Sequence, residues 1–254
     1  LINSAVSNAI NNFDLDKNFS ELVFVGDLHW RLLTFQEKLE KFKLKNTLFF
    51  HVGDFSICEY NLSIGKLDVL NEALKKAKSH LISIRGNHDD PSYFAKKFSL
   101  SNINLIADFT ICKVSINKKY LNILGIGGAV SIDRVLKKGM GEWFLGEELP
   151  YLDNYDFLKQ DFNLDIIVTH TAPISFWPNT FGPIVYDYLI ADVNLTAEIT
   201  YERKKLQEIV DIILEYNKKV SHYYYGHFHF TYRTTYLDKI EVILLDKEEL
   251  LIHH

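Results

Sequence analysis

The chain is poor in the residues that mark several protein classes. Its 254 residues include two cysteines, Cys58 and Cys112, so neither a disulfide framework nor a Cys-x-x-Cys motif is expected. This scarcity favours a reducing, cytoplasmic setting. No Pro/Gly/Ser-rich linker or run of charge divides the chain. One domain over residues 21–254 is therefore predicted, preceded by an N-terminal arm or short helix over residues 1–20.

Long hydrophobic runs and an excess of basic charge are also missing. No apolar segment approaches the ~18 residues of a membrane span, so no membrane partner is expected. The formal net charge of -5 argues against broad phosphate neutralisation along a nucleic acid, although a local basic patch stays open. Because Met140 is the single methionine, Leu1 is not expected to be the natural start, and His253 and His254 are interpreted as a tag remnant.

What the chain does contain is a series of short apolar runs that each end in polar residues. Residues 21–25, 47–52 and 81–84 have the length and composition of buried strands, and amphipathic helices are predicted at 32–42 and 64–77 between them. This alternation predicts a parallel sheet, in which functional groups lie in the loops beyond the carboxyl ends of the strands.

The residues in these loops are typical metal ligands. Asp27 and His29 follow the first strand, Asp54 the second, and Asn87 and His88 the third. In an extended backbone, side chains two positions apart point the same way, so Asp27 and His29 can reach one ion. An alternative remains open, in which Asp27 caps a helix and His29 is a bystander.

The second half of the chain repeats this arrangement. A strand at 165–169 ends at His170, and a helix at 206–216 precedes a strand at 221–225 that leads to His227 and His229. Hairpins are predicted at 109–126 and 232–245. His51, inside its strand, is expected to be a hydrogen-bonded histidine of the core or one that supports a ligand.

Two stretches have no regular pattern. Residues 131–150, which include Arg134 and Glu147, could rim a pocket or form an ordinary surface loop. Residues 171–200 hold three of the five prolines and several aromatic residues, and they are predicted to be irregular. Because long irregular loops are uncommon unless functional, we interpret residues 171–200 as a substrate-contacting flap.

The ligand types restrict the metal. Asp, His and Asn without Cys suit manganese, iron or zinc in a mixed oxygen and nitrogen shell. Two carboxylates among neutral ligands leave two divalent ions with a residual charge of about +2, so the site should attract a phosphate anion.

The order Asp-x-His, Gly-Asp, Gly-Asn-His-Asp, His, Gly-His-x-His resembles the calcineurin-like metallophosphoesterase superfamily over about residues 21–245. The resemblance implies an α/β fold, a four-layer α/β/β/α sandwich with two central mixed sheets and a metal site at the strand carboxyl ends. It further implies one metal held by Asp27, His29, Asp54 and His229, and another held by Asp54, Asn87, His170 and His227. Asp54 would bridge the two ions. His88 matches the catalytic histidine, which is expected to protonate the leaving oxygen or stabilise the transition state.

The implied function is hydrolysis of phosphate esters, either monoesters or diesters, by a dinuclear metal site that turns a bound water into the attacking hydroxide. Manganese is the ion expected to serve in vitro, and the substrate is expected to be small and phosphorylated, with nucleotides among the candidates. Two alternatives stay open: a metal-dependent nuclease, which would need a basic groove, and a catalytically weak metal-binding interaction module. The intact set of seven ligand positions disfavours the second.

Departures from the family pattern narrow the range of candidate substrates. Serine/threonine protein phosphatases carry Asp-Arg-Gly soon after the Gly-Asp and a Glu after Gly-Asn-His, whereas this chain has Phe55-Ser56 and Asp89. A protein phosphatase is therefore disfavoured, and the partner of His88 is left open. Trp30 stands where many members have Gly, and could stack on a base or simply pack. Trp30, Arg31 and Arg134 are the candidate substrate contacts, with a structural role as the alternative for each.

Overall fold

The computed structural model describes residues 9–58, 65–176 and 183–254. The strands in these ranges are β1 (Asn11–Phe19), β2 (Glu21–Val25), β3 (Thr47–His51), β4 (His80–Ser83), β5 (Ser99–Leu100), β6 (Ile103–Leu105), β7 (Thr110–Ile116), β8 (Lys119–Ile126), β9 (Ile166–Thr169), β10 (His222–Tyr225), β11 (Tyr232–Tyr236), β12 (Ile240–Leu244) and β13 (Leu250–Ile252). The helices are α1 (Leu32–Lys41), α3 (Lys66–Lys76), α4 (Pro91–Ala95), α5 (Arg134–Met140), α6 (Pro183–Ala191) and α7 (Leu195–Tyr216), with short 3-10 turns at Asp156–Leu158 and Ile174–Phe176.

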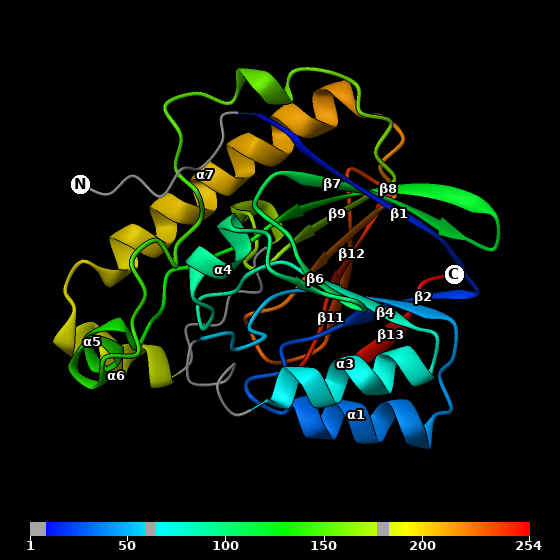
Figure 1. The fold of residues 1–254 in the computed structure, drawn as a ribbon. Coiled ribbons are helices and arrows are strands. Elements are labelled where there is room, and N and C mark those ends of the chain that lie inside the picture. Colours follow the sequence, from blue (N-terminus) through cyan, green and yellow to red (C-terminus); the bar gives the residue numbers. More distant parts are fainter. Residues whose placement is uncertain (1–8, 59–64, 177–182) are drawn as a thin grey trace.

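The strands form two mixed sheets (Figure 1). The seven-stranded sheet has the order β1-β7-β8-β9-β10-β12-β11, and the six-stranded sheet has the order β13-β2-β3-β4-β6-β5. In the second sheet, β2, β3, β4 and β6 run parallel, and antiparallel strands β13 and β5 close its two edges. In the first, β8, β9, β10 and β12 run parallel, as do the edge pair β1 and β7.

The two sheets pack face to face, and helices cover both outer faces. Because side chains alternate along a strand, Phe24 of β2 enters the core between the sheets while Val23 and Val25 face the helices α1 and α3. The same alternation places Tyr224 of β10 between the sheets, and its neighbour Tyr223 in the core beneath α7. Figure 1 shows α7 above the sheets and α1 and α3 below them. The predicted four-layer α/β/β/α sandwich is confirmed.

Two predicted segments differ from the structure. The expected N-terminal arm or short helix is, over Asn11–Phe19, the edge strand β1, which pairs in parallel with β7. Its side chains alternate between more and less exposed positions, and Phe13 and Leu15 pack on the core between the sheets. The two-residue period of this segment is the sequence signal for a strand, and its polar composition obscures that signal. Residues 1–8 lie outside the described part of the chain.

The predicted flap at residues 171–200 is largely helical, not irregular. It contains the turn at Ile174–Phe176, helix α6 and the first residues of α7, which begins at Leu195. Residues 177–182 of this segment lie outside the described residues. The stretch 131–150, left open as a pocket rim or a loop, contains the short helix α5.

His253, interpreted above as part of a tag remnant, is held by the fold. Leu250–Ile252 form β13 on the edge of β2, the His253 N–H donates to the Leu22 carbonyl, and the Tyr224 hydroxyl and His253 Nδ1 are 2.9 Å apart. Among the described residues, no helix has the length and apolar character needed to cross a membrane.

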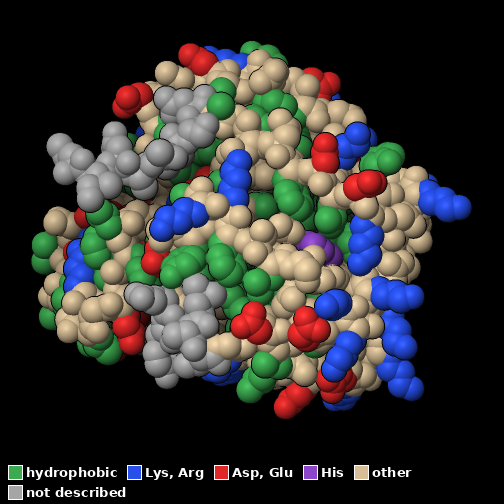
Figure 2. All heavy atoms as spheres, in the orientation of Figure 1, with side chains coloured by type: hydrophobic (Ala, Val, Ile, Leu, Met, Phe, Trp, Pro, Cys, Tyr) green, Lys and Arg blue, Asp and Glu red, His purple; other side chains and the backbone are tan. Residues whose placement is uncertain are grey.

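The surface is uneven in charge. In the face shown in Figure 2, Lys and Arg side chains gather on the right-hand side, and hydrophobic side chains are exposed at the lower left, where α5 and α6 lie. Both helices carry exposed apolar side chains, such as Leu136 of α5 and Ile190 of α6, with exposed fractions of 52% and 85%.

Candidate metal centre

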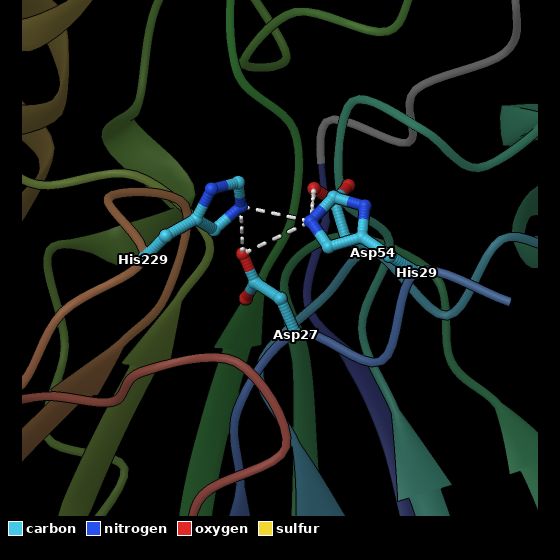
Figure 3. A group of neighbouring side chains, drawn as sticks. All are labelled: Asp27, His29, Asp54 and His229. Carbon is cyan, nitrogen blue, oxygen red and sulfur yellow. Dashed lines mark hydrogen bonds and ion pairs between the residues drawn. The ribbon is translucent and has the colours of Figure 1, made fainter. Parts of the chain in front are cut away.

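Four side chains from three separate loops meet beyond the carboxyl ends of β2, β3 and β10. The ligand atoms of Asp27, His29, Asp54 and His229 all lie within 4.8 Å of one another (Figure 3). His29 Nε2 is 2.8 Å from His229 Nε2 and 3.5 Å from Asp54 Oδ2. His229 Nε2 is 3.3 Å from Asp27 Oδ2. Each of these atoms can donate a lone pair to one ion placed among them.

A second group lies next to the first and shares Asp54 with it. Ligand atoms of Asp54, His170 and His227 lie within 4.8 Å of one another. Asn87 Oδ1 lies between the two rings, 3.0 Å from His170 Nε2 and 3.0 Å from His227 Nδ1. The Val52 carbonyl can only accept, so His170 Nδ1 donates to it over 2.9 Å, and this leaves His170 Nε2 to face the group. A histidine held in this way by its other nitrogen is typical of metal sites.

The buried carboxylates of both groups fit a cation. Asp27 and Asp54 are each 1% exposed. Within the described chain, Asp27 Oδ1 and Asp54 Oδ2 have no hydrogen-bond partner. A buried ionised oxygen without a partner is costly, and a divalent ion would remove that cost. The donor set of carboxylate, imidazole and amide oxygen therefore fits manganese, iron or zinc.

The electrostatic environment keeps most of these ligands in the form that binds metals. Burial lowers the pKa of His29 to about 4, and burial together with His170 holds the pKa of His227 well below 6.5. Burial acts to raise the pKa of Asp54, but His170 and His88 outweigh it and hold that pKa well below 3.8. Burial acts to lower the pKa of His170, but the nearby Asp54 carboxylate outweighs this effect, and the net result is a pKa raised to about 9. A cation that binds beside His170 must therefore displace a proton from it.

The backbone at the site is held in an unusual conformation. His29, Asp54, His227 and His229 all have positive φ angles, between 40° and 72°. Each left-handed residue other than glycine costs about 1–2 kcal/mol. Such residues persist where the surrounding structure holds them, and they cluster at functional sites.

His88 lies at the rim of the site. Its backbone N–H donates to Asp54 Oδ1 over 2.8 Å, and its partly exposed ring lies edge-on to that of His29, with 4.9 Å between centroids. Asp89, the next residue in the chain, does not pair with His88 through any hydrogen bond in the described part of the chain, and its carboxylate points elsewhere. The Asp89 carboxylate accepts N–H groups from Phe55, Ile57 and Gly86, and so joins the loops after β3 and β4.

The predicted arginine contacts differ in how they are engaged. Arg134 is held by Asp192 and Glu198, and its side chain is only 10% exposed. Arg31 donates to Glu248 over 2.6 Å, but its side chain stays 59% exposed. A third arginine near the site, Arg85, which is not one of the substrate contacts named above, is buried and donates to Asp108 and to three backbone carbonyls, so its role is structural. Trp30, next to His29, is 40% exposed and has a φ of 71°.

His51 is confirmed as a hydrogen-bonded histidine of the core. It is fully buried in β3, and its Nδ1 lies 2.9 Å from Ser83 Oγ. The side chains behind Asn87 are Ser131, Lys137 and Glu147, and no contact between them and Asn87 was predicted from the sequence. A lysine and a glutamate inside a stretch with no periodicity carry no signal for burial.

These observations agree with the comparison with known families. Residues 21–230 match the model of the calcineurin-like phosphoesterases. The chain therefore belongs to the calcineurin-like phosphoesterase family, whose members carry out metal-dependent hydrolysis of phosphate esters. A search of curated proteins finds no match.

Proposed function

We propose that this protein is a dinuclear metal-dependent hydrolase of phosphate monoesters or diesters. The observation that carries the proposal is that Asp54 belongs to both groups of ligand atoms. One ion would be held by Asp27, His29, Asp54 and His229, and the other by Asp54, Asn87, His170 and His227. Two divalent ions bound there would polarise the phosphoryl group and lower the pKa of a water molecule.

The chain's own residues would supply position and protons. The negative charge of the two carboxylates attracts cations to the site. When no cation is bound, the same charge repels a phosphate group. His88 would hold a proton for the leaving oxygen, since its ring lies beside His29 at the exposed rim of the site. The hydrogen bond from the His88 backbone N–H to Asp54 fixes the position of His88 relative to both groups of ligand atoms.

The test is hydrolysis of p-nitrophenyl phosphate and bis-p-nitrophenyl phosphate with added Mn²⁺. Asp54→Asn should lose bound metal and activity together. His88→Ala should keep its metal and lose most of its turnover, about 100-fold or more for removal of a general acid. His222→Ala, a histidine in β10 away from the site, is the matched control. A fully active His88→Ala protein would refute the role given to His88, and an active Asp54→Asn protein would refute the site.

We also propose that Trp30 and Arg31 contact the organic part of the substrate, with a nucleotide as the candidate class. Both are exposed and follow His29 directly. Trp30→Gly should keep its thermal stability, because glycine accepts the positive φ at this position more easily than tryptophan. The variant should raise the KM for nucleotide esters and leave p-nitrophenyl phosphate hydrolysis unchanged. An equal effect on both substrates would contradict the proposed contact.

A further inference from the structure

Asn87 presents the two ends of its amide to different surroundings. Oδ1 faces the rings of His170 and His227, each 3.0 Å away, and Nδ2 donates to Ser131 Oγ over 2.8 Å. The two ends differ in chemistry but hardly in shape. A rotation by half a turn would place N–H donors among the ligand atoms, where a cation needs an oxygen. Some contact must hold the amide in the productive orientation.

Ser131 is in turn held by a buried ion pair. Lys137 Nζ donates to Ser131 Oγ over 2.8 Å, to Glu147 Oε2 over 2.7 Å and to the backbone carbonyl of Asn87 over 2.7 Å. The ammonium group has three donors and no acceptor, so these contacts use all of them. The Ser131 backbone N–H donates to Glu147 Oε1 over 3.3 Å. Lys137 therefore fixes both the backbone of Asn87 and the hydroxyl that holds its side chain.

The burial of these groups argues for more than stability. Lys137 is 3% exposed, and Ser131 and Glu147 are 0% exposed. A buried ion pair is often no more stabilising than apolar residues of the same volume, because both charges lose their water. Burial accordingly acts to raise the pKa of Glu147, against the opposing effect of Lys137. An arrangement so costly is best explained by what it orients.

We propose that Ser131, Lys137 and Glu147 are positioning residues that hold the Asn87 amide with Oδ1 toward the ion, and so set the affinity of one of the two metal sites. This inference rests on the proposed function, since it takes Asn87 as a ligand. In the described part of the chain, hydrogen bonds connect the three residues to Asn87 and not to Asp27, His29 or His229. The effect should therefore be confined to the site of Asp54, Asn87, His170 and His227.

The experiment is calorimetric titration of the full chain, stripped of metal, with Mn²⁺. Ser131→Ala removes the acceptor for Asn87 Nδ2 and leaves the Lys137–Glu147 pair in place. We expect one class of site to weaken about 10- to 100-fold, the range typical for loss of a group that orients a ligand, and the other class to be unchanged. Ser115→Ala is the matched control, because Ser115 is another buried serine that hydrogen-bonds an asparagine, Asn18, far from the site.

A double-mutant cycle separates orientation from general structure. If Ser131 acts through Asn87, then Ser131→Ala should have no further effect on Mn²⁺ affinity in an Asn87→Ala background. Unchanged affinity in Ser131→Ala, equal weakening of both sites, or a full additional loss in the double variant would each overturn the inference. A wild-type protein that binds no Mn²⁺ would instead overturn the proposed function itself, and this inference with it.

Discussion

Gly86 and Asp54 lie so close that a methyl group added at Gly86 would push apart the loops after β3 and β4. A Cβ at position 86 would be 2.1 Å from Asp54 Oδ1 and 2.3 Å from the Asp54 backbone nitrogen. Both are far inside van der Waals contact, and one of the atoms belongs to the backbone. Gly226 stands in the same relation to Asp27, with 2.1 Å to Oδ1. Glycine is thus required at these positions by the close approach of a carboxylate that is a predicted ligand.

We expect Gly86→Ala to displace Asp54 and to weaken Mn²⁺ binding by at least about tenfold, with a similar loss of hydrolysis. Gly139→Ala is the matched control, because a Cβ there meets nothing within 4 Å and alanine favours the helix α5. Metal titration and thermal melting of both variants measure the effect. If Gly86→Ala bound Mn²⁺ as tightly as the wild type, then glycine at this position would not be needed to place Asp54 for metal binding.

At the scale of elements, α5 connects the metal centre to the helical segment that follows β9. Lys137 of α5 points to Asn87, while Arg134, one turn earlier, is held by Asp192 after α6 and Glu198 in α7. Arg134 therefore fixes the position of α5, a role different from the substrate contact predicted for it.

Arg134→Met should lower the free energy of unfolding by about 1–2 kcal/mol, since Asp192 is partly buried and Glu198 is about half exposed to solvent. The hydrogen bond from Arg134 lowers the pKa of Asp192 from its usual 3.8. A lowered carboxyl pKa stabilises the folded state above pH 3.8, and this contribution is lost as the pH falls through the lowered value. Urea denaturation of the wild type and of Arg134→Met between neutral and acidic pH measures the difference in their free energies of unfolding. This difference should be largest at neutral pH and should shrink below pH 3.8. A difference that grows in acid would contradict the assignment.

The edge strand β13 gives a second test at this scale. Leu251 packs on the core between the sheets, whereas its neighbour Ile252 is 41% exposed. Leu251→Ala should cost about 1–3 kcal/mol and Ile252→Ala less than about 0.5 kcal/mol. Chemical denaturation of the pair measures both. Equal effects would mean that β13 is not seated on β2 as described.

At the scale of the whole molecule, the candidate metal centre joins residues of the two sheets. Asp27, Asp54 and Asn87 follow strands of the six-stranded sheet, and His170, His227 and His229 follow strands of the other. An ion held by both sets binds only the folded arrangement, so metal binding should stabilise the fold as a whole.

Removal of metal by a chelator should therefore lower the melting temperature. At a free ion concentration of 100 times Kd, one site contributes about 2.7 kcal/mol, which corresponds to roughly 5–10 °C for a chain of this size. Thermal melting with and without Mn²⁺ measures the shift, and Asp54→Asn is the control in which most of it should vanish. A melting temperature independent of Mn²⁺ in the wild type would contradict a site shared by the two sheets.

Much of the fold could be predicted from local sequence. The apolar runs of β2, β3, β4, β9 and β10 predict strands because all their side chains except those of Glu21 and His222 are buried, on one face by the other sheet and on the other by helices. The polar residues at their ends predicted a site, because carboxyl ends of parallel strands share one edge. Strand β1 was missed because its two-residue period is weak in a polar segment, and the helices within residues 171–200 were missed because prolines and aromatic residues obscured them.

The sequence by itself determined where the candidate site residues stand: the seven predicted ligands and His88 follow the ends of strands, where local patterning places them. Only the tertiary structure decided what supports them. The Asp89 carboxylate binds backbone N–H groups of Phe55 and Ile57, which are 34 and 32 residues away in the chain. Arg134 is held by Glu198, 64 residues away, and Asn87 by Ser131 and Lys137, 44 and 50 residues away. Such contacts arise from packing between elements, and their geometry leaves no period or motif in the sequence.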